Sequence, residues 1–331
     1  MKKITSLLLT LCICFSCVGL FASCDNNLPT NNKEETSYKQ NSNSNSNSNE
    51  DKPNNEEKPI VYSEGLEYSL SEDRTYLIVT DVGTCKDTTI VIPPSFNDVP
   101  VKAIGYCAFG GGSFVKPNAP YVREVIIPDS VTEIGEAAFA NNTYLKKITF
   151  GKSIENIADD AFYNCKYLEE VHISDLKSWC NITFCSYTST PFYYGKNAKM
   201  YVNNKPITEL IIPDGVTEIK SSAFSYCLFI TKVKIGSSVT DISDGNSLTG
   251  AFAGCSNLTK VEISESVTYI GSYAFDDCSM LLHVFFEDPS NWKCTSFNDE
   301  LHISEIDLSI SNTAAMYLAD TYVKYDWYKQ Q

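Results

Sequence analysis

Four cysteines recur at one position of a repeated pattern, and they are the first residues whose chemistry has to be considered. Each follows the phenylalanine of an Ala-Phe pair by three residues: Cys165, Cys227, Cys255 and Cys278. Thiolates repeated at one strand spacing, about 4.8 Å, could bind a metal ion or take part in redox chemistry. The alternative is a small, slightly polar residue at a repeated buried position, which Asn142 occupies in its own unit. We favour the buried structural role for these cysteines.

Other candidate ligands and nucleophiles give weak signals. Nine cysteines follow Cys24, an odd number, so they cannot all pair as disulfides within one chain. Cys180 and Cys185 could approach each other or bind a metal ion, but no histidine stands at a suitable spacing. The three histidines accompany no Gly-x-Ser-x-Gly motif, and the sequence has no phosphate-binding glycine loop. We therefore expect no cofactor, no metal site and no catalytic site.

An aromatic segment in the middle of the chain has the composition of a contact surface. The stretch "YTSTPFYYG", residues 187–195, supplies Tyr187, Phe192, Tyr193 and Tyr194. Tyrosine is enriched among the residues that dominate binding interfaces, so these four are candidate ligand contacts. The alternative is a variant coil whose aromatic rings fill a gap left by a missing core phenylalanine, and the residues leave both interpretations open.

Two tryptophans stand at equivalent places in two similar stretches. "VHISDLKSWCNITF" (171–184) and "VFFEDPSNWKCTSF" (284–297) match at Val, Asp, Trp and Phe. Recurrence at one offset favours packing over ligand binding for Trp179 and Trp292. The terminal "MYLADTYVKYDWY" (316–328) is predicted to cover the last unit, because the terminal units of a repeat array need a cap.

The N-terminal residues have the pattern of an export signal followed by a modification site. A basic start and an apolar stretch span residues 1–23, as in a signal peptide. "LFASC" resembles a bacterial lipobox, in which the cysteine, here Cys24, is lipidated, although Phe21 stands where leucine is usual. The resemblance implies a lipid anchor in the bacterial membrane. A retained membrane-spanning helix is the alternative, because about 20 apolar residues could cross a bilayer.

Residues 24–60 are predicted to be a lipidated cysteine and a disordered tether. The stretch "NSNSNSNSNEDKPNNEEKP" offers almost nothing apolar to bury. A coil of about 36 residues spans on the order of 35 Å between its ends. The whole chain carries a formal charge of −15, which gives no basic surface for a nucleic acid, so we expect no nucleic-acid partner.

The rest of the chain is organised by a repeat. The phenylalanines that follow alanine are Phe109, Phe139, Phe162, Phe224, Phe252 and Phe275, with spacings of 30, 23, 62, 28 and 23 residues. A period in the twenties is typical of a solenoid. Each unit predicts one short strand in "LEEVHI"-like stretches, a second in "VTEI"-like stretches, and a helical turn at Ala-Phe. About nine coils at strand spacing would extend on the order of 40 Å.

"IPDSVTEIGEAAFANNTYLKKITF" (127–150) and its copies resemble the BspA-type leucine-rich repeat of bacterial surface proteins. The resemblance implies a repeat solenoid: a right-handed, leucine-rich-repeat-like coil of short β-strands with short helical turns, mainly β. The domains expected are an N-terminal cap and first repeat (61–110), repeats (111–297) with an insertion at about 174–207, and a C-terminal cap (298–331).

The resemblance also implies a function. Proteins of this type are surface proteins of adhesion, with an extracellular protein as partner, such as the matrix protein fibronectin or a surface protein of another cell. We expect an exported, lipid-anchored interaction protein and not an enzyme. Two alternatives remain: a surface lipoprotein that captures glycans or peptides, and an envelope hydrolase with its site in the 174–207 insertion.

Overall fold

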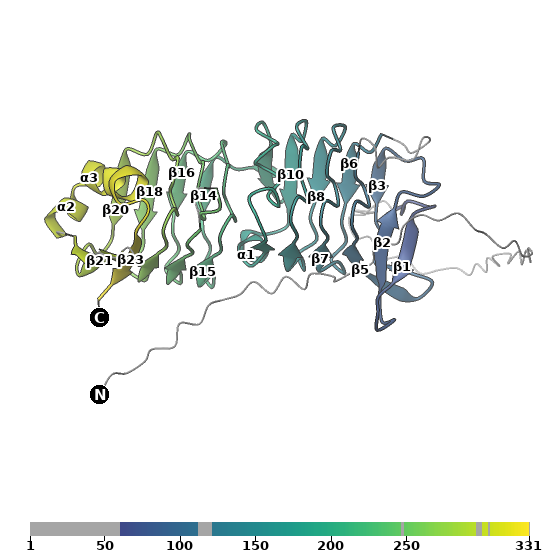
Figure 1. Cartoon of the computed structure of the whole chain (residues 1–331), viewed down its shortest axis with the longest axis horizontal. Helices are drawn as coiled ribbons and strands as arrows, with labels where there is room; N and C mark the ends of the chain where they lie inside the picture. The colour runs from purple at the N-terminus through teal and green to yellow at the C-terminus, as the bar shows by residue number, and fades with distance from the viewer. Residues whose placement is uncertain (1–59, 112–120, 246–247, 296–299, 304, 331) are drawn as a thin grey trace, which may run out of the picture. The chain divides into compact units, whose positions relative to one another are not determined.

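The computed structural model describes residues 60–111, 121–245, 248–295, 300–303 and 305–330. The folded unit is Val61–Gln331. The predicted signal peptide, the lipidation at Cys24 and nearly all of the tether therefore lie outside the described residues. No helix among the described residues is both long enough and apolar enough to span a bilayer. The unit Val61–Gln331 is mainly β and forms a solenoid of about eight turns, close to the nine predicted (Figure 1).

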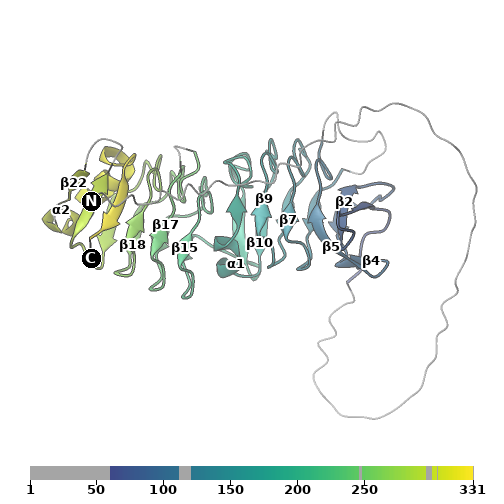
Figure 2. The same ribbon diagram turned by 60° about the horizontal axis from the view of Figure 1, so that its bottom comes forward.

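Each coil contributes one strand to each of two rows of strands, and each row is divided into two sheets. In the N-terminal half, one sheet has the order β1 (Glu67–Leu70), β2 (Leu77–Asp81), β5 (Val99–Ile104), β7 (Glu133–Ile134), β9 (Asn156–Ile157), β11 (Thr183–Phe184), and β4 (Ser95–Phe96) pairs with β5. The other has the order β13 (Lys205–Pro206), β12 (Lys199–Val202), β10 (Glu170–Ile173), β8 (Lys147–Thr149), β6 (Glu124–Ile126), β3 (Thr89–Val91). Figure 2 shows β5, β7 and β9 following one another along one side.

The C-terminal half repeats this arrangement with two new sheets. One has the order β14 (Glu209–Ile211), β16 (Lys232–Lys234), β18 (Lys260–Ile263), β20 (His283–Phe286). The other has the order β15 (Glu218–Ile219), β17 (Asp241–Ile242), β19 (Tyr269–Ile270), β23 (Asp326–Lys329), β21 (Trp292–Thr295), β22 (Glu300–His302). The helices are α1 (Leu176–Cys180), α2 (Glu305–Ser309), α3 (Ser311–Met316) and the π-helix η2 (Tyr317–Thr321).

The core is a column of phenylalanine rings, one from each Ala-Phe pair. Rings of neighbouring coils stack nearly parallel, with centroids 5.2 Å apart for Phe139 and Phe162 and 5.2 Å apart for Phe252 and Phe275. All of the repeat phenylalanines are buried: Phe109, Phe139, Phe162, Phe224, Phe252 and Phe275. Burying each ring contributes roughly 1.5–3 kcal/mol, which a single coil could not obtain alone.

Left-handed residues bracket the Ala-Phe pairs and turn the chain at each one. In one coil they are Ala137 (φ 55°) and Asn141 (φ 59°), which stand two residues before and two residues after Phe139. Between them the chain forms consecutive hydrogen-bonded turns, in which the N–H of Asn142 donates to the carbonyl of Phe139 at 3.0 Å. The pattern recurs with Asp160 and Asn164, Ser222 and Tyr226, and Tyr273 and Asp277.

The repeated cysteine donates a hydrogen bond to the preceding coil. The Sγ atoms of Cys165, Cys255 and Cys278 lie 3.1, 3.0 and 3.3 Å from the carbonyl oxygens of Phe139, Phe224 and Phe252, listed in the same order. Asn142 provides the same contact with its amide, because its Nδ2 donates to the carbonyl of Phe109 at 3.1 Å. Cysteine and asparagine are therefore interchangeable here as small buried donors.

The thiols of the four repeated cysteines have low chemical reactivity. Burial raises the pKa of Cys165 and of Cys255 to about 12, and it raises the pKa of Cys227 and Cys278 well above the ordinary value. A protonated thiol is a poor nucleophile and a poor metal ligand. None of the nine cysteines among the described residues forms a disulfide, and this includes Cys180 and Cys185.

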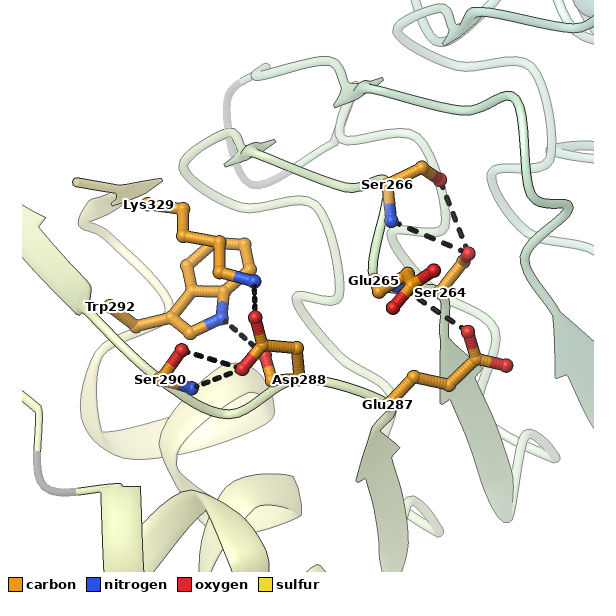
Figure 3. A network of polar contacts seen from close by, with 8 residues as sticks. All are labelled: Ser264, Glu265, Ser266, Glu287, Asp288, Ser290, Trp292 and Lys329. Carbon is orange, nitrogen blue, oxygen red and sulfur yellow. Dashed lines mark hydrogen bonds and ion pairs between the residues drawn. The ribbon is translucent and has the colours of Figure 1, made fainter. Parts of the chain in front are cut away.

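The C-terminal segment closes the last coil with antiparallel strands. Strand β23 pairs with β19 and with β21, and the indole of Trp327 is buried beneath them. Figure 3 shows the carboxylate of Asp288 between Lys329, with which it forms an ion pair, and Ser290, whose N–H and hydroxyl donate to it at 3.0 and 2.6 Å. The indole N–H of Trp292 donates to the Asp288 carbonyl at 3.2 Å.

Replacing Cys255 with alanine should lower the free energy of unfolding by about 0.5–1.5 kcal/mol, because the buried Phe224 carbonyl loses the thiol donor and keeps only the hydrogen bond from the Cys227 N–H at 3.4 Å. Cys255→Ser keeps a donor at the same place and should cost less than Cys255→Ala. Urea denaturation of the full-length protein measures both variants. Equal losses for alanine and serine would show that the hydrogen bond contributes nothing and that only volume matters.

The stability of the C-terminal cap should depend on acid pH through Asp288. Hydrogen bonds from Lys329 and then Ser290 lower the pKa of Asp288 to about 2 in the folded protein, below the value of about 3.9 in an unfolded chain. The carboxylate therefore stabilises the fold above pH 4, and this contribution disappears as the pH falls towards 2. Thermal unfolding should show Asp288→Asn less stable than the parent protein at pH 7, with the difference shrinking near pH 2. A difference that is the same at both pH values contradicts this assignment.

Candidate functional site

The strand face is the outer surface of the two sheets that contain β3 to β13 and β14 to β20. In the C-terminal half, pairing in register places the outward side chains in two rows. The first row is Glu209, Lys232, Lys260 and His283, and the second row is Ile211, Lys234, Glu262 and Phe285. In the N-terminal half the corresponding rows are Thr89, Glu124, Lys147, Glu170, Lys199 and Val91, Ile126, Thr149, His172, Tyr201. Rows of this kind arise because alternate residues of a strand point to opposite faces.

Charges alternate in the row Glu124, Lys147, Glu170, Lys199, and ion pairs join neighbouring coils in both halves. Lys147 Nζ lies 3.0 Å from Glu124 Oε1, and Lys232 Nζ lies 2.6 Å from Glu209 Oε1. These pairs are partly or fully exposed, so each contributes little to stability. Their arrangement instead gives the face a fixed pattern of charge that a partner can match.

A row of tyrosines borders the N-terminal half of the strand face, and the sequence interpretation did not include it. Tyr121, Tyr144 and Tyr167 stand at the same place in successive units, and 61%, 49% and 60% of their surfaces are exposed. The rings of Tyr121 and Tyr144 are in contact, with centroids 4.3 Å apart. The recurrence of tyrosine before "VRE", "LKK" and "LEE" was the available signal.

His172 lies within this face as part of a packed polar group. Its Nε2 lies 2.8 Å from Glu170 Oε2, its Nδ1 lies 3.1 Å from Asn204 Oδ1, and its ring stacks on Tyr201 with centroids 4.5 Å apart. Asn204 belongs to the hairpin turn between β12 and β13, in which Asn203 and Asn204 are both left-handed. Only 8% of His172 is exposed, and its hydrogen bond to Asn204 connects strand β10 to the hairpin turn.

The insertion after β10 fills the space between the two halves of the column. Asp175 caps α1, accepting from the N–H of Ser178 at 2.7 Å, and the helix directs Trp179 inwards. The Trp179 indole N–H donates to the carbonyl of Ala223, 44 residues later, at 2.7 Å. Trp179 and Trp292 are both buried, which confirms the packing interpretation for the two tryptophans.

The structure separates the four predicted aromatic contacts. Phe192 is 1% exposed and packs against Trp179 and Phe229, so the prediction of Phe192 as a ligand contact is wrong. Phe192 stands four residues after Thr188, whose carbonyl accepts from the Phe162 N–H as the Ala161 carbonyl accepts from the Phe139 N–H, and its ring fills the core there. Tyr187, Tyr193 and Tyr194 are partly exposed.

These three tyrosines belong to a tyrosine cluster that also contains Tyr163 and Tyr226. Tyr193 is central, with ring centroids 4.7 Å from Tyr187, 4.9 Å from Tyr194 and 4.6 Å from Tyr226. Tyr194 also contacts Tyr163, at 5.0 Å. Burial, reinforced by neighbouring tyrosines, raises the pKa of Tyr194 to about 12. The cluster therefore offers neutral hydroxyl groups and ring surfaces, which suit stacking and hydrogen bonding.

Metal or nucleophilic chemistry has no support within the described ranges. They contain no group of three or more His, Cys, Asp or Glu side chains that could hold a metal ion. In the insertion, burial raises the pKa of Cys180 to about 12, so this thiol is not an activated nucleophile. The strand face and the tyrosine cluster offer charged groups, hydroxyl groups and ring surfaces for non-covalent contacts.

The BspA type leucine-rich repeat region matches residues 112–193 and 196–317, in six copies. A search of curated proteins found no match. Among solved structures, a leucine-rich repeat protein of T. pallidum is 24% identical, covers 66% of this chain and 88% of its own, and has a TM-score of 0.42. A leucine-rich cell surface protein of Faecalibacterium prausnitzii is 18% identical, with coverage of 70% and 96% and a TM-score of 0.25. The pneumococcal vaccine antigen PcpA is 19% identical, with coverage of 68% and 66% and a TM-score of 0.33.

Proposed function

Because the chain belongs to the BspA-type leucine-rich repeat family, we propose that it is a lipid-anchored surface protein that adheres by binding an extracellular protein through its strand face. The observation that carries the proposal is the pair of regular rows of outward side chains on successive strands. A repeat protein of this family is a scaffold for protein interaction. Adhesion, the lipid anchor and a matrix protein such as fibronectin as partner are the parts that we propose.

A repetitive face suits this role for a physical reason. Each exposed ion pair or tyrosine contributes little alone, but contacts on one rigid surface act together once the first has formed. The alternating charges favour partners with a complementary pattern and disfavour others. The proposed anchor at Cys24 and the tether up to residue 60 would hold this face away from the membrane.

Exchanging a charge pair on the strand face tests the proposal without removing an ion pair. In the double variant Glu124→Lys/Lys147→Glu the two side chains can still pair, but the order of these two charges in the row is reversed. We expect binding of the full-length protein to immobilised fibronectin to weaken at least tenfold at physiological salt, measured by surface plasmon resonance.

The matched control is the exchange Asp129→Lys/Lys152→Asp, which reverses a 3.0 Å ion pair on a turn outside the strands. This variant should bind as the parent protein does. Binding that is weakened equally by both exchanges, or by neither, contradicts binding through the strand face. If the protein shows no saturable binding to fibronectin or to any other matrix protein, adhesion loses its support.

The tyrosine cluster supports a second candidate function, the capture of glycans, because sugar rings stack on aromatic side chains that also offer hydroxyl groups. We expect Tyr193→Ala to abolish any glycan binding, since Tyr193 contacts three other rings of the cluster. Tyr193→Phe keeps the ring and should retain most of the affinity. A glycan array probed with the parent protein and both variants measures this binding. Glycan binding that is unchanged in Tyr193→Ala excludes the tyrosine cluster as the glycan site.

A further inference from the structure

The sheet of β14, β16, β18 and β20 begins with an open edge in the middle of the solenoid. Strand β14 pairs in parallel with β16, and no strand of the described chain pairs with its other side. Leu210 lies opposite Val233, and the Ile212 N–H donates to the Lys234 carbonyl at 3.0 Å. Because successive main-chain groups alternate in direction, the N–H and C=O groups of Glu209 and Ile211 point to the open side.

The two outer ends of the strand face are covered, unlike this edge. At β3, Ser63 donates from its N–H to the Val91 carbonyl at 3.0 Å and accepts from the Val91 N–H at 3.1 Å. At β20, helix α3 packs beside the strand (Figure 1). At β12, the neighbouring strand β13 continues the sheet as a hairpin. By contrast, 61% of Ile211 is exposed, an unusual position for an apolar, β-branched side chain beside unpaired main-chain groups.

The open edge lies in a segment of the folded unit with a positive charge balance, between two longer acidic segments. Residues 174–235 contain seven lysines and four carboxylates, a net charge of +3. Residues 60–173 contain nine basic and sixteen acidic residues, a net charge of −7, and residues 236–331 contain four and fourteen, a net charge of −10. An acidic ligand is therefore repelled by both flanking regions and attracted to the stretch between them.

Lysines stand at both ends of β14 and beside it. Lys205 is exposed in β13, a few residues before β14 begins. Lys177 of α1 reaches the turn after β14, where its Nζ lies 3.0 Å from the position that a Cβ on Gly215 would occupy. Lys234, in the adjacent strand, is exposed next to Ile211 in the outward row.

We propose that the open edge of β14 binds an extended, acidic segment of a partner polypeptide, which adds a strand to this sheet. The inference rests on the proposed function and gives the chemistry of a segment that such a partner would present. Main-chain hydrogen bonds to Glu209 and Ile211 hold the segment, and its carboxylates face Lys177, Lys205 and Lys234. Ile211 contributes apolar contact at the centre.

The test uses the full-length protein and the acetylated, amidated decapeptide (Glu-Val)5, with fluorescence anisotropy for affinity and amide hydrogen exchange for location. We expect at least tenfold tighter binding than for (Lys-Val)5, weakening as salt is added. On binding, exchange at the amides of Glu209 and Ile211 should slow, while the already bonded amide of Ile212 changes little. An acidic peptide that shows no binding at 1 mM overturns the proposal.

The main-chain hydrogen bonds of the β14 edge and the positive charge of the nearby lysines can be removed separately. Ile211→Pro deletes a donor that points outwards and should abolish binding, as should N-methylation of every second residue of the peptide, which leaves the protein intact. Lys177→Glu/Lys205→Glu should weaken binding at least tenfold, whereas Lys166→Glu, at an exposed site in the N-terminal half, should change it less than twofold. Binding that survives both Ile211→Pro and N-methylation overturns the edge assignment.

The outcomes are separable from those for the proposed function. Fibronectin binding that responds to the Glu124/Lys147 exchange, together with no peptide binding, leaves the strand-face proposal standing and overturns the β14 edge. Peptide binding at Glu209 and Ile211 without any binding to matrix proteins supports the β14 edge and overturns the strand-face proposal. A protein that instead dimerises with protection of the same amides shows that a second copy occupies the edge, which also overturns the proposal.

Discussion

A hydrogen bond between buried groups of neighbouring coils underlies the regularity of the rest of the solenoid. The thiol of Cys165 or Cys255, or the amide of Asn142, reaches the carbonyl of the previous coil's core phenylalanine, at 3.0–3.1 Å in each case. Each of these hydrogen bonds contributes about 0.5–1.5 kcal/mol. Since the donor follows the phenylalanine by three residues, one short segment fixes both the ring stacking and the step to the next coil. Outward side chains of successive strands consequently stand in rows, and these rows form the strand face.

The 62-residue gap between Phe162 and Phe224 shows what happens when the repeat is interrupted. Trp179 and Phe192 fill the core across the gap, and the Trp179 indole is hydrogen-bonded to Ala223 in the second half. On the strand face the interruption is not filled, because the chain turns back through the β12–β13 hairpin and starts a new sheet at β14. The core is therefore continuous across the interruption, while the hydrogen-bonded face is divided. An interruption of this kind introduces a local site into a surface that is otherwise repetitive.

The periodic part of the structure could be predicted from the sequence, and the aperiodic part could not. The positions of the repeat phenylalanines and the burial of Trp179 follow from recurrence at fixed offsets, because recurrence reports a shared place in the coil. For Phe192 the sequence left a ligand contact and a core ring both open, since composition alone does not tell which of three adjacent aromatic residues points inwards. The β14 edge depends on which strands pair, and pairing across the hairpin cannot be read from spacing.

The most direct measurement of the central claim is side-chain footprinting of the full-length protein, free and bound to an extracellular protein ligand. Lysine acylation and hydroxyl-radical labelling report on exposed side chains individually. The account predicts that Lys232, Lys260 and Tyr144, on or beside the strands, lose reactivity on binding, while Tyr106 on the turn before Phe109 keeps its reactivity. Protection confined to the turns, with the strand-face lysines as reactive as in the free protein, would contradict it.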